Sequence, residues 1–281
     1  MSTEHLHSIK GSPLGRKSDY AAEYDKSLLF PIPRAIKRAE IGLKRDIPFV
    51  GYDIWNAYEM SWLNTRGKPC VAIGEFYIPA DSINIIESKS FKLYLNTFNN
   101  TIFNTKREVI TTLMADISAA IAAPIMVSLV DIKDYADRHI KQFSSTCIDD
   151  LDIECSCYTI NSDLLERGSK DNVSLSIHSN LLKSNCPVTG QPDWGSVEIT
   201  YTGQEISQES LLRYLVSFRN QNEFHEQCVE RIFMDIYNKF IPSNLTVYAR
   251  YTRRGGLDIN PIRSTINMTL PQKLNIRQAR Q

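Results

Sequence analysis

The chain has 281 residues, of which 42% are apolar, and its 32 lysines and arginines balance 32 aspartates and glutamates. This apolar fraction excludes a disordered chain, and the zero net charge gives no overall attraction to nucleic acid or to a membrane surface. Since no apolar run reaches the roughly 18 residues that span a bilayer and the N-terminus lacks a signal-peptide pattern, we expect a cytoplasmic protein that binds neither membrane nor nucleic acid directly.

Residues 1–45 are polar and turn-rich and are predicted to form an N-terminal arm. The stretch 34–45 is strongly basic. Charge runs of this kind usually belong to a solvated surface, so we interpret it as a solvated arm packed over the domains. An RNA-binding segment is the alternative.

Residues 46–160 are predicted to form a first module of strands and paired helices. Thr105 and Glu108 make a capping-box pattern that begins a helix, and Pro124 ends it. Alternating apolar residues indicate strands, and apolar residues three and four positions apart indicate helices. The expected elements are strands at 71–78 and 83–86, helices at 88–99 and 105–123, and strands at 126–130 and 147–153.

Residues 161–281 are predicted to form a second module with the same order of elements. The two halves are therefore an internal duplication of a ββααββ architecture, although their sequences differ. Antiparallel strands with a helix pair on one face predict an α+β fold. The expected elements are strands at 173–183 and 196–202, helices at 207–218 and 222–240, and strands at 245–251 and 256–259.

The loop between the strands at 173–183 and 196–202 contains Cys186 and Asp193. A free thiol has a pKa near 8.5, so a nucleophilic cysteine needs a nearby base or positive field. Asp193 can fold back across the proline-rich turn to meet that need. From the residues alone, a buried small cysteine with a turn-forming aspartate explains the pattern as well.

Three further polar residues lie at or near predicted helix starts. His225 points towards the apolar face of the helix at 222–240 and Glu226 lies at its flank, while Glu87 precedes the helix at 88–99. From the pattern alone, His225 is interpreted as a core histidine and the two glutamates as ordinary acids at helix starts, where the helix dipole favours them.

The cysteines and histidines indicate no metal site. Cys155 and Cys157 are spaced for neither a zinc knuckle nor an unstrained disulfide. Val229 stands where His225-Glu226 would need a second histidine to form a zinc-protease helix. We therefore expect reduced thiols, of which at most one is reactive.

A Rossmann cofactor site is not indicated, because no G-x-G-x-x-G follows a predicted strand. If a dinucleotide binds, side chains and a short glycine turn must hold its phosphates. Arg253-Arg254-Gly255-Gly256 at a strand end fits that need. A basic hairpin turn is the other interpretation of the same residues.

The loop Ser184-Asn185-Cys186 with Gln191-Pro192-Asp193-Trp194-Gly195 resembles the active-site loop of NADPH-dependent 7-cyano-7-deazaguanine reductases. These are the nitrile reductases of queuosine biosynthesis, a tRNA modification, and the resemblance is to their long, two-module form. The similarity runs from Leu14 to about Arg263. Three further segments match in order, at residues 87–94, 218–228 and 251–258.

This resemblance implies two tandem tunnel-fold (T-fold) modules, NADPH as cofactor, and a homodimer. The implied reaction is four-electron reduction of 7-cyano-7-deazaguanine to 7-aminomethyl-7-deazaguanine. It also implies that Cys186 forms a covalent thioimide, that Asp193 transfers protons and that His225 acts beside them. The substrate would contact Ile86, Glu87, Ser88, His225 and Glu226, and NADPH would contact Ser88, Lys89, Arg253, Arg254 and Gly255.

Two other functions stay open at this point. One is a tunnel-fold hydrolase that acts on a purine or pterin without zinc. The other is a non-catalytic base- or tRNA-binding module, which would explain the basic arm without thiol chemistry.

Overall fold

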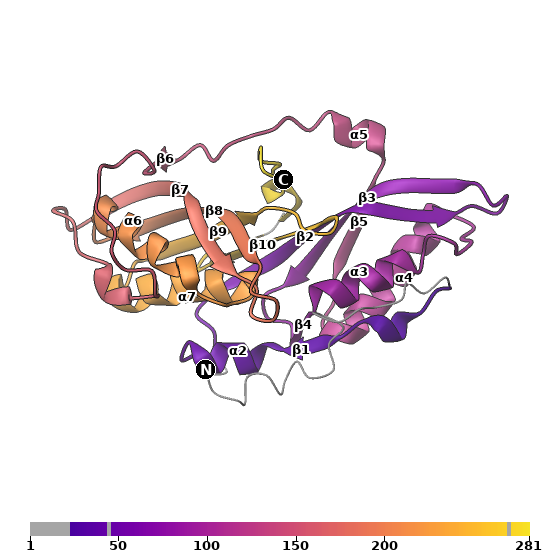
Figure 1. Cartoon of the computed structure of the whole chain (residues 1–281), viewed down its shortest axis with the longest axis horizontal. Coiled ribbons are helices and arrows are strands. Elements are labelled where there is room, and N and C mark those ends of the chain that lie inside the picture. Colours follow the sequence, from indigo (N-terminus) through magenta and orange to yellow (C-terminus); the bar gives the residue numbers. More distant parts are fainter. Residues whose placement is uncertain (1–22, 44–45, 269–270) are drawn as a thin grey trace. The chain divides into compact units, whose positions relative to one another are not determined.

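The computed structural model describes residues 23–43, 46–268 and 271–281 (Figure 1). It confirms the predicted α+β class and divides into two compact units. Unit 1 holds residues 23–37, 54–139 and 253–258, and unit 2 holds the described parts of 38–53, 140–252 and 259–281. Because this division falls inside α2 (Arg34–Glu40), β2 and β10, the units are not consecutive stretches of chain. The module boundaries at residues 45 and 160 stay a prediction.

Unit 1 is built on strands in the order β5-β3-β2, with α3 and α4 beside them (Figure 1). Strand β3 pairs antiparallel with β5, which places Ile73 opposite Val130. A separate two-stranded sheet joins β1 to β4. The elements are η1 (Lys26–Leu28), β1 (Pro31–Pro33), β2 (Val50–Leu63), β3 (Pro69–Pro79), β4 (Asn84–Ile86), α3 (Ser88–Asn96), α4 (Lys106–Ile121), β5 (Met126–Val130) and α5 (Ile132–Ala136).

Unit 2 has strands in the order β10-β9-β8-β7-β6. Strands β7 and β8 form a long antiparallel hairpin, and β9 pairs antiparallel with both β8 and β10. The elements are β6 (Thr146–Cys147), η2 (Ser162–Leu164), β7 (Val173–Asn185), β8 (Pro192–Gly203), α6 (Gln208–Ser217), η3 (Phe218–Asn220), α7 (His225–Phe240), β9 (Asn244–Tyr251), β10 (Leu257–Ser264) and η4 (Pro271–Leu274).

The predicted duplication is present as a hairpin, a helix pair and a returning strand in each unit. In unit 1 these are β2-β3, α3-α4 and β5, with the short β4 between β3 and α3. In unit 2 they are β7-β8, α6-α7 and β9, with η3 between the two helices. The second helix of each pair ends at a non-glycine residue in the left-handed region, Ala122 with φ 54° and Ile241 with φ 47°. This conformation is uncommon outside glycine, so its recurrence at both ends is a specific sign of the repeat.

Two strand predictions need correction. The predicted strand at 147–153 is only two residues long, as β6, because Asp149 turns its carboxylate to the Ser179 hydroxyl at 2.6 Å and the Asn180 amide. Strand β2 was missed altogether. Its residues Ile54 to Ala57 are at most 1% exposed on both faces, so the alternation that marks a half-buried strand is absent.

The described part of the basic stretch, residues 34–43, has its basic side chains buried, which corrects its interpretation as a solvated arm. Residues 1–22 of the predicted arm and residues 44 and 45 of the basic stretch lie outside the described residues. Within unit 1, Arg34 is 4% exposed and its Nε donates to the Ser82 hydroxyl at 3.0 Å. Within unit 2, Arg38 is 9% exposed and forms a two-point contact with Glu230, with Nε and Nη2 at 2.9 and 2.7 Å from the carboxylate oxygens.

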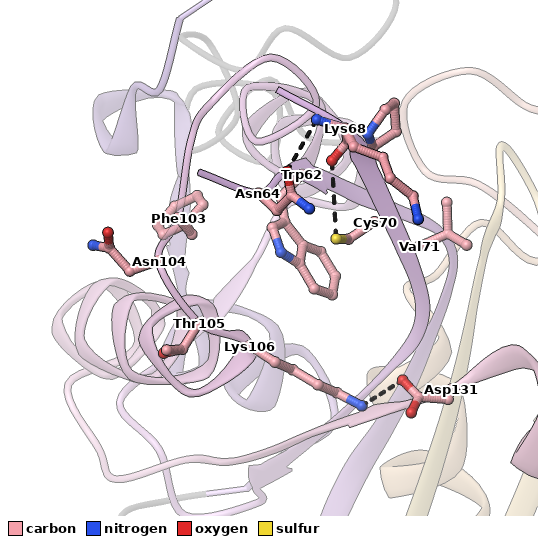
Figure 2. Close-up of a pocket in the computed structure, with 11 residues that line it drawn as sticks. Trp62, Asn64, Lys68, Cys70, Val71, Phe103, Asn104, Thr105, Lys106 and Asp131 are labelled. Atoms are coloured by element: carbon pink, nitrogen blue, oxygen red, sulfur yellow. Dashed lines mark hydrogen bonds and ion pairs between the residues drawn. The ribbon is translucent and has the colours of Figure 1, made fainter. Parts of the chain in front are cut away.

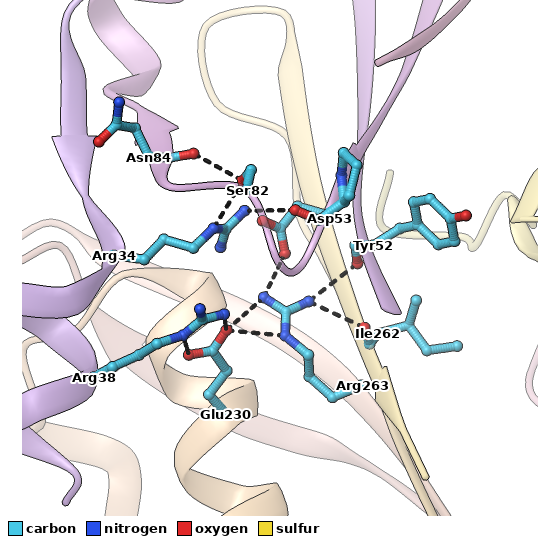
Figure 3. A network of polar contacts seen from close by, with 10 residues as sticks. Arg34, Arg38, Tyr52, Asp53, Ser82, Asn84, Glu230, Ile262 and Arg263 are labelled. Atoms are coloured by element: carbon cyan, nitrogen blue, oxygen red, sulfur yellow. Dashed lines mark hydrogen bonds and ion pairs between the residues drawn. The ribbon is translucent and has the colours of Figure 1, made fainter. Parts of the chain in front are cut away.

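Glu230 is the centre of a buried ionic cluster in unit 2 (Figure 3). Besides Arg38 it accepts from Arg263, whose Nε and Nη2 lie 3.0 and 2.9 Å from Glu230 Oε1. Arg263 is fully buried and also contacts Asp53 at 2.8 Å. Burial alone would lower the pKa of Arg263, but Asp53 and Glu230 raise it above its ordinary value. The cluster joins helix α7 to α2 residues and to β10.

Removing the charge of Glu230 should destabilise the protein strongly. In Glu230→Gln two buried guanidinium groups lose their shared carboxylate, and breaking a buried ion pair from one side typically costs about 3–5 kcal/mol. Urea unfolding measures the change. The control is Glu209→Gln, which removes an exposed i,i+4 pair with Arg213 and should cost under about 0.5 kcal/mol. Equal losses in the two variants would contradict the structural role given to the cluster.

Candidate active site

The predicted site residues fall into two groups, one in each unit, and each group is described by itself. Unit 2 holds Cys186, Asp193, His225 and Glu226. Unit 1 holds the candidates for base and cofactor binding at residues 86–89 and 253–255.

Cys186 lies in the tight turn that joins β7 to β8. Its amide donates to the Gln191 carbonyl at 2.8 Å, and its carbonyl accepts from the Gly190 amide at 3.0 Å. Gly190 has φ +67°, a conformation that favours glycine, so it allows the turn to close. The thiol-bearing residue is 5% exposed. Sequence reasoning placed Asp193 in a loop, whereas the structure places it on β8.

A β-bulge sets the face on which Cys186 lies. Ser179 pairs with Val197 and Leu182 with Gly195, so two residues of β7 oppose one residue of β8. Before the bulge Ile177 and Ser179 are buried; after it the buried positions are Leu182 and Ser184, two and four residues before Cys186. The extra residue therefore shifts the alternation by one and turns Cys186 to the inner face, together with Asp193.

His225 begins α7 and faces Asp193. Its Nε2 lies 3.4 Å from Asp193 Oδ1, and its ring stacks on Tyr251 with centroids 3.8 Å apart and planes 4° apart. His225 Nδ1 is buried and has no hydrogen-bond partner among the residues that the structure describes. The imidazole is thus held by its face and can exchange a proton with the carboxyl group at its edge.

Backbone hydrogen bonds tie the end of β7 to the segment that precedes α7. The Asn185 amide donates to the Gln221 carbonyl at 2.7 Å, and the Glu223 amide donates to the Asn185 carbonyl at 3.1 Å. Glu223 is also buried against Arg231, whose Nε lies 2.8 Å from its carboxylate. These bonds fix the turn carrying Cys186 against the helix start carrying His225.

Tyr251 is held from both sides, and its role beside His225 was missed from sequence. Its amide donates to the Asn260 side-chain oxygen at 3.1 Å, and its carbonyl accepts from the Gln281 side-chain amide at 3.0 Å. Gln281 is held in turn by Arg250 Nε at 2.9 Å. On the other side Gly195 lies directly against the ring. No local pattern connects Gln281 to a residue 30 positions away, so sequence offered no signal for it.

The second buried cysteine is a poor nucleophile. Cys228 is fully buried in α7, and burial, followed by the nearby Glu223 charge, raises the pKa of its thiol well above the ordinary value. It therefore stays protonated near neutral pH. In the same helix Glu226 is 5% exposed in the first turn, where the helix dipole stabilises a carboxylate.

In unit 1, Glu87 caps helix α3. Its two carboxylate oxygens accept from the amides of Lys89 at 2.7 Å and Ser90 at 2.8 Å, and the residue is 1% exposed. These contacts are those of an ordinary acid that caps a helix start, as one of the two interpretations of Glu87 predicts. Oε1 also accepts a longer hydrogen bond of 3.4 Å from the Ser88 hydroxyl, whereas Oε2 keeps a second lone pair, so capping does not preclude a contact with a ligand. Ile86 beside it is 2% exposed in β4, and Ser88 and Lys89 are half-buried.

The residues Arg253 to Gly256 form a tight hairpin turn in unit 1. Arg254 and Leu257 exchange two backbone hydrogen bonds of 2.8 and 3.1 Å, and Gly255 and Gly256 have φ +60° and +79°. Two positive φ values identify the glycine-dependent hairpin geometry. The Arg253 guanidinium stacks over the Tyr58 ring at 4.1 Å. Lys92 reaches the same turn, since an added Cβ on Gly255 would lie 3.2 Å from its Nζ.

Unit 1 also contains a pocket of about 450 Å³ at the place that the repeat makes equivalent to the Cys186 turn (Figure 2). Leu63 bonds to Thr101 and Phe103 as Asn185 bonds to Gln221 and Glu223. The residue after the bridged strand end is Asn64 here and Cys186 in unit 2. The amide side chain of Asn64 is no nucleophile, so the position equivalent to Cys186 carries no thiol. The cysteine that lines this pocket, Cys70, lies on β3 instead. It is lined by Trp62, Asn64, Lys68, Pro69, Cys70, Val71, Phe103, Asn104, Thr105, Lys106 and Asp131.

Two kinds of feature are absent from the described residues, a metal-binding cluster and a membrane-spanning helix. No group of three or more His, Cys, Asp or Glu in the described ranges could hold a metal ion. Over the same ranges, no helix combines the length and the apolar character needed to cross a membrane.

Comparisons with known proteins agree over nearly the whole chain. Residues 20–129 match the family described as "Nitrile reductase, 7-cyano-7-deazaguanine-reductase N-term", and residues 192–269 match "QueF-like protein". A relative named NADPH-dependent 7-cyano-7-deazaguanine reductase in Polaromonas sp. (strain JS666) is 55% identical, with 98% of this chain and 100% of the relative covered. Proteins of the same name in Burkholderia orbicola and Acidovorax ebreus are both 54% identical, covering 96% and 98% of this chain and 98% and 100% of their own.

The crystal structure of the archaeosine synthase QueF-Like in the apo form also matches. It covers 36% of this chain and 100% of its own, with a TM-score of 0.31 and 17% identity. A likeness at this level carries no argument about the site.

Substituting Gly195 should disturb the stacked pair. A Cβ on this residue would stand 3.1 Å from Cδ1 and Cε1 of Tyr251, closer than ordinary van der Waals contact, so in Gly195→Ala the ring must shift against His225. The His225 ring resonances in an NMR spectrum should move, because they report the ring current of Tyr251. Thr200→Ala, on the same strand but exposed, is the control. Unchanged His225 resonances in Gly195→Ala would contradict the contact.

Proposed function

The chain belongs to the family of NADPH-dependent 7-cyano-7-deazaguanine reductases, and we propose that it reduces 7-cyano-7-deazaguanine to 7-aminomethyl-7-deazaguanine for queuosine biosynthesis. The observation that carries the proposal is the grouping in unit 2 of a buried cysteine, Asp193 and His225. Such a set suits addition of a thiol to a carbon–nitrogen triple bond followed by proton transfer to nitrogen.

The nucleophile is Cys186. Its sulfur adds to the nitrile carbon, which forms a sulfur–carbon bond and converts the triple bond to the double bond of a thioimide. A nitrile is a weak electrophile, whereas a thioimide accepts hydride readily. Each NADPH, when bound, would supply one hydride, so the four-electron reduction needs two NADPH. Once the thioimide carbon has gained the first hydride, the sulfur–carbon bond breaks, which frees Cys186 and leaves the imine that takes the second hydride. The buried position of Cys186 keeps out the water that would hydrolyse the adduct and the later imine.

Proton transfer is assigned to Asp193, with His225 beside it. The Cys186 thiol loses its proton as sulfur attacks, and the nitrile nitrogen gains one, so a single carboxyl group can take the first and deliver the second. His225 lies 3.4 Å from Asp193 and is held flat by Tyr251, which suits it to shield or protonate the imine nitrogen. Positioned proton transfer is typically worth about 10²–10⁴ in rate.

Base recognition is assigned to Glu226, with Glu87 as the second acid and Ile86 and Ser88 beside it. Glu226 is 5% exposed, so a desolvated carboxylate can accept the adjacent N–H donors of a guanine-like ring. Glu87 is 1% exposed and is oriented by the two amides that it caps.

The phosphates of NADPH are assigned to unit 1. The turn at Arg253, Arg254 and Gly255 offers guanidinium donors, and its glycine leaves the backbone open to a phosphate. The other proposed contacts are Ser88 and Lys89 at the start of α3. We also propose a homodimer that works in the cytoplasm, as the family resemblance implies.

Trapping the adduct tests the proposed function. With 7-cyano-7-deazaguanine present and NADPH withheld, no later step consumes the thioimide, so intact-protein mass spectrometry should show a gain of one substrate mass on the peptide containing Cys186. Cys186→Ala should lose both the adduct and NADPH oxidation. Cys228→Ala is the matched control, since that thiol is buried and protonated. Turnover in Cys186→Ala, or the added mass on another cysteine, would overturn the mechanism.

Arg254 should select the cofactor. A guanidinium fork holds phosphate through two hydrogen bonds, and NADPH carries a 2′-phosphate that NADH lacks. Arg254→Ala should raise the KM for NADPH by at least about 10- to 100-fold, the effect of losing even one of these charged hydrogen bonds, with the nitrile KM little changed. Steady-state kinetics with both cofactors measures this. Arg66→Ala, in the exposed β2–β3 turn, should change neither constant. An unaltered preference for NADPH in Arg254→Ala would refute the assignment.

A further inference from the structure

Ser184 carries a buried hydroxyl that makes no hydrogen bond within the described part of the chain. The residue is 0% exposed, and its Oγ has no hydrogen-bond partner among the residues described. Leaving a buried polar group unpaired typically costs about 1–3 kcal/mol, and most such groups in folded proteins are paired. Stability does not explain a serine at position 184, because alanine would fill the position without the cost of an unpaired hydroxyl.

The hydroxyl lies beside the reacting residues. Ser184 is two residues before Cys186 and directly opposite Asp193 across the β7–β8 ladder. Directly opposite residues of an antiparallel pair have Cβ atoms about 4.5–5.5 Å apart on the same face. The bulge that turns Cys186 inwards turns Ser184 to that same face, where Leu182 and Asp193 are also buried.

We propose that Ser184 is a further catalytic residue, whose hydroxyl donates a hydrogen bond to the nitrogen of the nitrile attacked by Cys186. The inference rests on the proposed function. As the sulfur–carbon bond forms, electron density moves from the triple bond to nitrogen, and a donor fixed in a dry site stabilises that developing charge. Ser184 keeps its own proton. The proton that nitrogen gains comes from Asp193, so the atoms balance without a new co-reactant.

Ser184→Ala tests this role through two measurements, the rate of adduct formation and the melting temperature. If Ser184 only stabilised the fold, its loss would lower both. The rate of adduct formation with 7-cyano-7-deazaguanine, without NADPH, should fall about 10- to 100-fold, because one hydrogen bond to a charged group is lost. The melting temperature should stay the same or rise, because no hydrogen bond of the unliganded protein is removed. Ser184→Cys, with a weaker donor, should react at an intermediate rate.

Ser196→Ala is the matched control on the partner strand. Ser196 is 2% exposed, but its hydroxyl donates to Asn180 Oδ1 at 2.8 Å, so its loss should lower the melting temperature and leave the adduct rate unchanged. An adduct rate in Ser184→Ala equal to that of the unaltered protein would overturn the role of Ser184 alone. Absence of any adduct in the unaltered protein would overturn the proposed function, and the role of Ser184 with it.

Discussion

The chemistry proposed for unit 2 depends on one short backbone pairing, in which Asn185 bonds to Gln221 and Glu223. Strand β7 and helix α7 are far apart in sequence, and no covalent feature keeps the turn after β7 beside the first turn of α7. The two amide–carbonyl bonds do so, and they involve only backbone atoms of the residue before Cys186. The position of the thiol relative to Asp193 and His225 is therefore set by secondary structure on both sides, which suits proton transfers that fail when groups move by about an ångström.

Helix α7 can serve as a rigid carrier because its buried face is anchored by charge as well as by apolar packing. Glu226 and Glu230 are one turn apart, and Glu230 is held by two guanidinium groups. The same buried cluster would be weak evidence for stability on its own, since desolvation opposes it. The cluster matters because its hydrogen bonds have fixed directions. Bonds to Arg38 and Arg263 hold the helix against sliding and rotation, which apolar packing alone restricts less.

Sequence patterns predicted the helices and strands whose apolar residues recur at regular spacing. They failed where a strand is buried on both faces or where one inserted residue shifts the spacing. Helices α3, α4, α6 and α7 and strands β3, β5, β7 and β9 follow from periodicity and capping, whereas α2 and α5 were not predicted. The resemblance named Cys186, Asp193 and His225. Strand β2 was missed because Asp53 and Asn56 are as buried as Trp55. Its residues therefore do not alternate between apolar and polar, and this alternation is the pattern by which a strand is predicted. The bulge could not be foreseen either: extending the alternation from Ile177 would turn Cys186 outwards. Tyr251 lay in a matched segment, but only tertiary structure shows its ring on His225.

Because the architecture is duplicated, the contribution of the backbone frame to the site can be distinguished from that of the side chains. Both units bridge the end of a long hairpin strand to the segment before the second helix by the same pair of backbone bonds. One bridge is followed by Cys186 and the other by Asn64. The backbone frame alone is therefore insufficient for reactivity. In the proposed mechanism, reactivity needs a thiol at the turn, a carboxyl group on the next strand and an imidazole at the helix start. The chain builds this backbone frame twice, and only the frame in unit 2 carries the three groups that the proposal requires.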